Sequence, residues 1–366
     1  MNRYFYYNVF LVSLLNLMLF IPHILINYRY NGAVSSMIIA PFIGTGLAFL
    51  FIRVMHKFPG KGLPEILEQF FSKMVAVPIL LFNAAIWLIA SIIAVVSYAV
   101  LINRFFNPDT SPLIVLVLLC LVCAYAATRS SLSMIFLIEM GLLINMPLIV
   151  LLLVKAIRSN AISWDAVRTV AHYWSQPPKL QPLGAATFLF TGYMHYAIFN
   201  RVNPPNFRLK YRWLIPVSCT LIMLITFFVP IGFNGTETVD DYLYLWSVTS
   251  DSMLMSYGFI ERVLFVFLIL YLNLTLIYTA SGWHQAMEFI KSCLPHNKIN
   301  IDPEKTPLAN WIIVSTFIIM TIATYYLVNE KQVSMISSAW LSVRMFTEVG
   351  VVGILFILAL RRKKSS

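Results

Sequence analysis

Among the charged residues within long apolar stretches of the sequence, Glu139, Arg344 and Glu348 lie away from the ends of their stretches. A charge in the middle of a bilayer costs about 2.5–3.5 kcal/mol on insertion scales, so each such residue marks a candidate functional site. Arg344 and Glu348 are four residues apart, which places both on one face of a helix, where they can form an ion pair. The alternatives are that Arg344 snorkels to the membrane surface and that the carboxylates make structural hydrogen bonds. We predict that these three residues belong to a buried polar network or proton pathway.

Two of the apolar stretches contain residues that interrupt a helix. Asn16 precedes Pro22 in the first stretch, and Thr191-Gly192-Tyr193 lies near the middle of the sixth. Unwound backbone at membrane depth is tolerated only where it is buried in protein or lines a cavity. Interruptions at corresponding positions of two halves indicate an inverted-repeat transporter fold with a site at the midplane. The residues predicted to line a ligand site are Asn16, Trp87, Thr191, Gly192, Tyr193 and Asn273.

An enzymatic role would rest on His23, which could act as the general base of a membrane acyltransferase. The sequence supplies no acidic partner nearby, and it contains no P-loop, HExxH or GxSxG pattern. Cys120 and Cys123 form a CxxC without a second pair, which favours packing over metal binding. We therefore predict a protein that is not an enzyme and that uses neither a cofactor nor a metal.

The elements that position these residues follow from the composition. Of the 366 residues, 60% are hydrophobic and 11% are charged, whereas an average soluble domain is roughly 45–50% apolar and about 25% charged. A bilayer accommodates such a chain if each segment satisfies its own backbone hydrogen bonds, as helices do. The net charge of +11 is scattered over short loops, which argues against nucleic acid as a partner. The fold predicted is therefore an all-α integral membrane domain that occupies residues 1–366.

Ten stretches are long and apolar enough to span a bilayer, which requires about 20 residues. They are residues 5–27, 34–55, 77–101, 111–128, 131–154, 183–200, 213–233, 258–282, 308–328 and 339–360. Five stretches fall in each of two halves, residues 1–154 and 183–360, and a basic tail, residues 361–366, follows. With the N-terminus inside the cell, 17 basic residues lie on the cytoplasmic side and 7 on the outer side. The positive-inside rule therefore predicts that both termini are cytoplasmic.

Two loops are predicted to be structured. Residues 62–73 place apolar side chains at helical spacing after Pro64, which is typical of a short amphipathic helix at the inner interface. Residues 237–257 begin with acidic residues and are rich in Tyr, Trp and Leu, which indicates an outer interfacial helix or lid.

The chain resembles the B subunits of spore germinant receptors, which are permease-like proteins of the amino acid–polyamine–organocation superfamily. The resemblance extends over nearly the whole chain and rests on the order and spacing of short motifs. These are Leu-Phe-Ile-Pro at the end of the first span, Lys57-Phe58-Pro59-Gly60, Leu63-Pro64-Glu65-Ile66, Trp164, Gly192-Tyr193 and Phe259-Ile260-Glu261-Arg262.

The resemblance implies a LeuT-like 5+5 inverted repeat of ten helices in the inner membrane of an endospore. It implies assembly with an A subunit and a C-subunit lipoprotein, and recognition of a small nutrient such as an amino acid. The sequence departs from the superfamily at Ser13-Leu14-Leu15-Asn16-Leu17, where the glycine-rich break expected in the first span is missing. The leading hypothesis is a receptor subunit that triggers germination. The alternative is a secondary transporter of amino acids or cations, coupled to protons through Glu139 or Glu348.

Overall fold

A computed structural model describes residues 2–106, 108–204, 207–253, 262–295, 302 and 306–364, with the backbone alone for 362–364. The described residues form helices and connecting turns, and no β-strand occurs among them. The all-helical class predicted from the composition is therefore confirmed. The predicted beginning of the eighth span, with Glu261, lies outside the described residues, as do residues 365 and 366 of the basic tail.

Among the described residues, seven helices are long and apolar enough to cross a membrane. They are α3 (Ala33–Met55), α5 (Lys73–Phe105), α7 (Ser131–Ile157), α11 (Leu214–Thr238), α13 (Val263–Ser292), α14 (Leu308–Leu327) and α15 (Glu330–Lys364). A bent pair formed by Asn2–Leu19 and Ile21–Asn27 makes an eighth if both parts form one span. The predicted stretch 111–128 is the shorter helix α6 (Pro112–Ala127), which has 16 residues. Seven or eight of the ten predicted stretches thus meet the length and composition of a span.

The first apolar stretch is broken. Helix α1 (Asn2–Leu14) continues as a 3-10 segment, η1 (Leu15–Leu19), and then turns by 59° into α2 (Ile21–Asn27). The turn occurs at Phe20, whose φ of 58° lies in the left-handed region that a residue with a Cβ rarely adopts. Pro22 follows in the first turn of α2, where it needs no backbone donor. The chain therefore breaks here without the glycine that the superfamily pattern would supply.

The sixth apolar stretch is also broken. It consists of α9 (Leu180–Phe188), the 3-10 segment η3 (Thr191–His195), α10 (Tyr196–Phe199) and the short segment η4 (Asn200–Val202). The two broken stretches lie against each other, because α1 contacts η3 and α2 contacts α9. Both interruptions predicted from the sequence are thus present, and the two broken stretches pack against each other.

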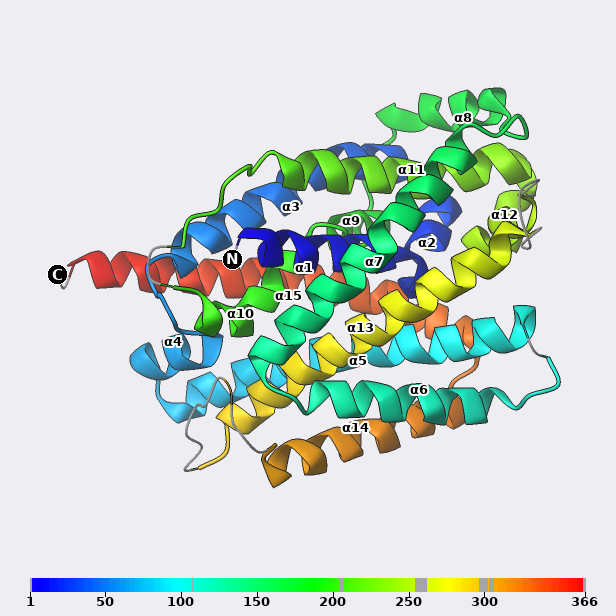
Figure 1. The fold of residues 1–366 in the computed structure, drawn as a ribbon. Coiled ribbons are helices and arrows are strands. Elements are labelled where there is room, and N and C mark those ends of the chain that lie inside the picture. The colour runs from blue at the N-terminus through cyan, green and yellow to red at the C-terminus, as the bar shows by residue number, and fades with distance from the viewer. Residues whose placement is uncertain are drawn as a thin grey trace.

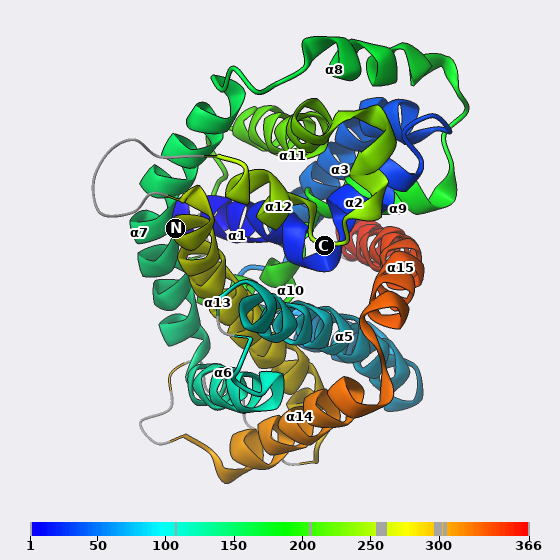
Figure 2. The same cartoon turned by 90° about the vertical axis from the view of Figure 1, so that its right-hand side faces the viewer.

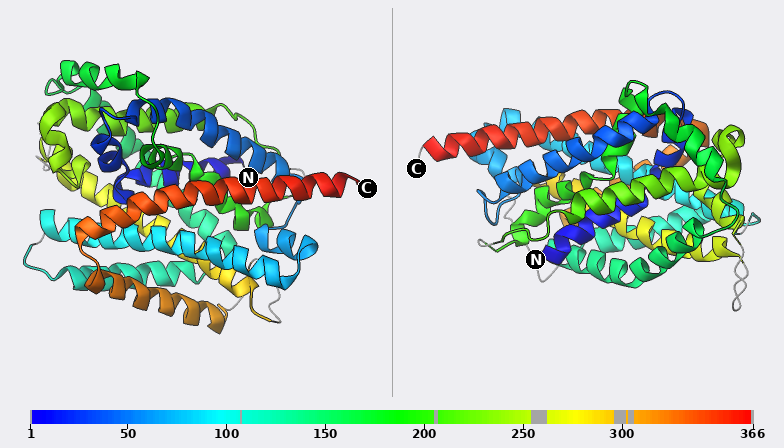
Figure 3. Two further views of the ribbon diagram at one scale, coloured as in Figure 1. Left: turned by 180° about the vertical axis from the view of Figure 1, so that it is seen from behind. Right: turned by 90° about the horizontal axis from the view of Figure 1, so that it is seen from above.

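The remaining helices surround this centre. Helices α5, α6, α14 and α15 run along the bundle, whereas α7 and α13 cross it obliquely (Figure 1). The beginning of α1 and the end of α15 lie toward the same end of the bundle (Figures 1 and 3). Figure 2 views the opposite end, where α2, α12 and the beginning of α15 meet. Helix α13 packs along α5, α7 and α6, so it contacts both the core and the outer layer.

Short helices cover the two ends of the bundle. Helix α4 (Leu63–Phe70) buries Leu63, Ile66 and Leu67, and its first turn is capped by Glu65, whose Oε2 accepts from the Gly62 amide at 2.5 Å. This confirms the amphipathic helix predicted within residues 62–73. At the other end, η5 (Val239–Asp241) and α12 (Leu245–Asp251) occupy the loop predicted to form a helix or lid. Helix α8 (Trp164–Ala171) lies beside α11.

Candidate functional site

A buried ion pair lies between α15 and the broken sixth stretch. Arg344 and Glu348 follow each other by one turn of α15, and Arg344 Nη1 is 2.9 Å from Glu348 Oε1. Arg344 is 2% exposed and Glu348 is 4% exposed, so Arg344 does not snorkel to the surface. Two charges removed from solvent in this way must satisfy each other and their remaining hydrogen-bonding groups.

The broken sixth stretch supplies these remaining partners. Arg344 donates to the Thr191 hydroxyl at 2.5 Å, to the Thr187 hydroxyl at 2.9 Å and to the Gly184 carbonyl at 2.6 Å. The Tyr193 hydroxyl lies 3.4 Å from Glu348 Oε2 and donates to it. We refer to Arg344, Glu348, Thr187, Thr191 and Tyr193 as the Arg344 cluster. It binds α15 to α9, which carries Gly184 and Thr187, and to η3, which carries Thr191 and Tyr193.

A small cavity adjoins the Arg344 cluster. Its lining includes Trp87 from α5, Thr191 from η3, and Trp340 and Thr347 from α15, together with the ion pair. Its volume is about 10 Å³, the room that one water molecule occupies. The Nε atom of Arg344 is buried without a hydrogen-bond partner among the described residues. The cavity is therefore too small for any ligand larger than a water molecule, and we call it the closed pocket.

Three of the predicted ligand-site residues meet at this pocket. Trp87 and Thr191 line it, and Tyr193 contacts its carboxylate. The indole of Trp87 also packs against the imidazole of His195 at a tilt of 35°, with 4.4 Å between ring centroids. The structure thus places side chains from α5, η3 and α15 around this one pocket.

Gly192 lies in close contact with the backbone of α1. A Cβ atom at this position would lie 2.4 Å from the Asn8 carbonyl oxygen and 2.4 Å from the Val9 Cα of helix α1. Both atoms belong to the backbone, so no side-chain rotation can relieve the clash. Gly192 is thus the residue that lets the two broken stretches touch.

Gly192→Ala is expected to destabilise the protein by about 1–3 kcal/mol or more, the range seen when a packed core is overfilled. Gly46→Ala on α3 is the matched control, because nothing lies within 4 Å of its added methyl group and alanine favours a helix. Thermal unfolding of the two variants in detergent compares them directly. An equal melting temperature for wild type and Gly192→Ala would show that the helices do not meet here.

The other predicted site residues lie elsewhere. Asn16 is buried in η1 and donates to the Ser13 carbonyl at 2.6 Å. Asn273 on α13 lies 3.4 Å from the Asn145 side chain of α7. Neither lines the pocket beside Arg344. The Asn16 amide therefore bonds its own broken stretch, whereas the Asn273 amide connects α13 to α7.

Glu139 also stands apart from the Arg344 cluster. Its Oε1 is 2.7 Å from Arg3 Nε, so its partner comes from the first helix rather than from its own. The Arg3 side chain is 62% exposed, whereas that of Glu139 is 8% exposed. Glu139 thus reaches toward the surface near the beginning of α1, and the three predicted charges form two separate pairs.

His23 lies at the far end of the bundle in α2. Its Nδ1 donates to the Tyr242 carbonyl at 3.2 Å, and its Nε2 accepts from the Asn27 side-chain amide at 3.2 Å. No ion pair to a carboxylate is formed by this ring among the described residues. The contacts of His23 are those of a residue that connects α2 to the loop before α12.

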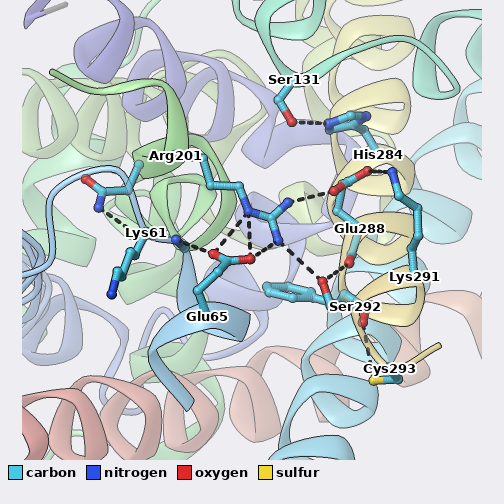
Figure 4. Close-up of polar contacts among 12 residues, drawn as sticks. Lys61, Glu65, Ser131, Arg201, His284, Glu288, Lys291, Ser292 and Cys293 are labelled. Atoms are coloured by element: carbon cyan, nitrogen blue, oxygen red, sulfur yellow. Dashed lines mark hydrogen bonds and ion pairs between the residues drawn. The ribbon is translucent and has the colours of Figure 1, made fainter. Parts of the chain in front are cut away.

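A second charged cluster lies near the termini (Figure 4). Arg201, 5% exposed, contacts Glu65 of α4 at 2.5 Å and Glu288 of α13 at 2.6 Å. Lys291 contacts Glu288 at 2.5 Å, and Ser292 lies 3.3 Å from Arg201. Burial alone lowers the pKa of Arg201, but the charges of Glu65 and Glu288 outweigh it and raise this pKa above its ordinary value. We refer to these five residues as the Arg201 cluster.

The sequence reasoning missed the Arg201 cluster. Arg201 and Lys291 are two of the 17 basic residues that predict the orientation of the chain. Glu65 lies in the short helix predicted within residues 62–73. The sequence signal for this cluster is the i,i+3 spacing of Glu288 and Lys291, which suits an ion pair on a helix. The structure shows that α13 extends ten residues beyond its predicted end at 282 and carries both residues. The Arg201 cluster connects the end of the sixth stretch to α4 and α13 through ion pairs.

A row of polar side chains on α13 lies between the two clusters. The Ser281 hydroxyl is 3.4 Å from His195, Gln285 donates to the Met194 carbonyl at 2.9 Å, and His284 lies 2.9 Å from the Ser131 hydroxyl. Figure 4 shows His284 and Glu288 on successive turns of this helix. The broken sixth stretch is thus held by polar contacts along its whole length, from Arg344 at one end to Arg201 at the other.

Comparison with known proteins places this architecture in a family. No curated protein matches the chain significantly. The sequence model of the family described as spore germination protein, a family of spore permeases, matches residues 9–333, which include both broken stretches and most of the helices above. The chain is an integral membrane protein with a permease-like arrangement, and it belongs to the spore germination protein family.

Proposed function

We propose that this protein is the B subunit of a nutrient germinant receptor, which binds a small germinant in its permease-like core and triggers germination. The observation that carries the proposal is the Arg344 cluster: a buried ion pair beside a closed pocket, where α15 meets the broken sixth stretch. Buried charges in a membrane domain are costly and are typical of substrate or signal pathways. The family to which the chain belongs supports a role in germination.

The fold that best accommodates these features has ten spans in a LeuT-like 5+5 inverted repeat. In this arrangement α6 and the broken stretch α9–η3–α10 are the fourth and sixth spans. The support is the contact of α1 with η3 and of α2 with α9, which pairs the first and sixth stretches. Discontinuous helices paired in this way are characteristic of inverted-repeat transporters.

The proposed setting is the inner membrane of the endospore, with both termini in the cytoplasm. The excess of basic residues near one end of the bundle supports this orientation. The proposed partners are a receptor A subunit and a C-subunit lipoprotein. The protein acts by binding and conformational change rather than by catalysis.

The closed pocket suggests how occupancy becomes a signal. A volume of about 10 Å³ excludes an amino acid, so binding requires a more open state. A ligand shifts such an equilibrium by as much as its affinities for the two states differ. The unused donor of Arg344 and the hydroxyl of Thr191 are groups that a nutrient carboxylate can engage only in the open state.

Germination of spores that lack this gene tests the proposal. The expected result is loss of the response to at least one nutrient, restored by a wild-type copy, while the response to a non-nutrient germinant such as Ca²⁺-dipicolinate persists. Spores that answer every nutrient normally without the gene, in a strain with no second copy, would contradict the proposal.

Secondary transport of amino acids or cations is the second candidate, and the paired broken helices favour it. Liposome flux of labelled amino acids under an imposed proton gradient separates the two functions. A receptor subunit gives no gradient-driven accumulation, whereas a transporter gives accumulation that Glu348→Gln reduces.

A further inference from the structure

A larger cavity opens at the end of the bundle opposite the termini. Its volume is about 510 Å³, and its lining comes from the ends of α5 and α14, the beginnings of α6 and α15, and the loop before α12. Small-molecule sites commonly have volumes of about 300–1,000 Å³. We call it the Arg104 cavity. It is separate from the closed pocket beside Arg344, with which it shares no lining residue.

The Arg104 cavity holds one ion pair and several aromatic faces. Arg104 Nη2 lies 2.7 Å from Glu330 Oε1, and its guanidinium stands over the ring of Tyr244, 5.6 Å from the centroid. Tyr325 and Tyr326 line the same space. The side chains of Arg104 and Glu330 are 49% and 32% exposed, so this pair can exchange partners at small cost, unlike a buried one.

The lining of the Arg104 cavity includes the break in the first stretch. Phe20, the residue with φ of 58°, lines the cavity and packs on Tyr244, with 5.7 Å between ring centroids. Left-handed backbone at a residue with a Cβ is a strained arrangement that clusters at ligand clamps and switches. An occupant that moved Arg104 and Tyr244 would therefore act directly on the bend of the first stretch.

The Arg104 cavity and the closed pocket both border α15. Val333 lines the cavity and Trp340 lines the pocket, and these residues are seven apart on α15, about 10 Å along the helix axis. The Trp340 indole donates to the Ile86 carbonyl at 3.0 Å, which connects α15 to α5 beside the pocket.

We propose that the Arg104 cavity is a separate recognition site for a free α-amino acid in its zwitterionic form. The carboxylate of the ligand replaces Glu330 on the Arg104 guanidinium, and its ammonium group binds Glu330. The exchange keeps each protein charge paired. The tyrosine rings accept the ligand side chain and stabilise the ammonium group through their faces. This site rests on the proposed function only in taking the ligand to be a small nutrient.

Binding to the purified full-length chain in detergent tests this site. Each of the twenty standard amino acids is titrated separately, and the tightest binder is compared with its carboxamide and with its deaminated acid. We expect saturable binding of at least one amino acid and at least tenfold weaker binding of both analogues. Arg104→Gln and Glu330→Gln are each expected to weaken binding at least tenfold. Arg168→Gln, which removes a more exposed pair with Asp165 on α8, is the control and should bind as wild type.

The outcomes separate this inference from the proposed function. Wild-type affinity in both Arg104→Gln and Glu330→Gln, with all variants monodisperse on gel filtration, would overturn the Arg104 site. If Thr191→Val alone abolishes binding, the ligand uses only the closed pocket, which overturns this site and leaves the proposed function intact. Absence of binding by every amino acid also overturns the site, whereas the gene-deletion experiment in spores decides the proposed function.

Discussion

Arg344→Met is expected to lower the free energy of unfolding by about 3–5 kcal/mol, the usual cost of removing one partner of a buried ion pair. The variant leaves the Glu348 carboxylate at 4% exposure with only the Tyr193 hydroxyl, at 3.4 Å, to offset its burial. It also removes three hydrogen bonds that bind α15 to the sixth stretch. Reversible unfolding in mixed micelles measures the change.

The double variant Arg344→Met, Glu348→Met tests whether this loss of stability comes from an unpaired charge. Removing both charges is expected to recover most of the lost stability, because well-packed apolar residues replace buried pairs at little cost. The control is Arg168→Met on α8, whose exposed pair with Asp165 contributes about 1 kcal/mol or less. Equal losses in the single and double variants would contradict the assignment of the penalty to an unpaired charge.

Arg201→Met is expected to lower the free energy of unfolding by a similar amount, about 3–5 kcal/mol. Arg201 is the cation shared by Glu65 and Glu288, and without it the two carboxylates of the cluster repel across a buried space. Lys291→Met should cost less, because Glu288 keeps its contact with Arg201 at 2.6 Å. Unfolding in mixed micelles ranks the two variants.

A double-mutant cycle between Arg201 and Glu65 tests the cause of this loss. The variant Arg201→Met, Glu65→Gln should be more stable than Arg201→Met alone, because the orphaned carboxylate is neutralised. Additive losses, within about 0.3–0.5 kcal/mol, would mean that the two residues do not interact and that Arg201 stabilises the bundle by packing.

Much of the fold follows from the amino-acid sequence because a bilayer imposes a strict length and polarity on each span. The apolar stretches at 34–55, 131–154 and 308–328 correspond closely to α3, α7 and α14. The predicted ends of the helices were wrong where polar residues extend a helix beyond its apolar stretch. Helix α15, for example, begins at Glu330 rather than at 339, because a helix that protrudes from the membrane needs no apolar face there.

The candidate site was predictable only in part. The four-residue spacing of Arg344 and Glu348 fixed their contact, since it depends on local helix geometry alone. The acceptors Thr187 and Gly184 were not predicted, because they reach Arg344 through the packing of α9 on α15. Glu139 could not be paired with Arg3 from spacing either, as 136 residues separate them.

The break in the first stretch was also predictable only in part. Pro22 signalled an interruption, but the sequence offered no glycine for the left-handed turn. The structure places Phe20 in that conformation, held by the Ser337 hydroxyl, which donates to the Leu19 carbonyl at 2.7 Å. Tertiary contacts from α15 thus impose a backbone conformation that local propensity disfavours.

The dose–response of germination in spores carrying Thr191→Val tests the central claim most directly, namely that the pocket beside Arg344 receives the nutrient. The change keeps the shape of the side chain and removes only the hydroxyl that accepts from Arg344 at 2.5 Å. We expect the nutrient concentration for half-maximal germination to rise at least tenfold, which corresponds to about 1.4 kcal/mol. Thr316→Val, on an exposed face of α14 where the hydroxyl bonds its own helix, should leave the curve unchanged. A Thr191→Val curve that coincides with the wild-type curve, at equal protein level, would contradict the claim.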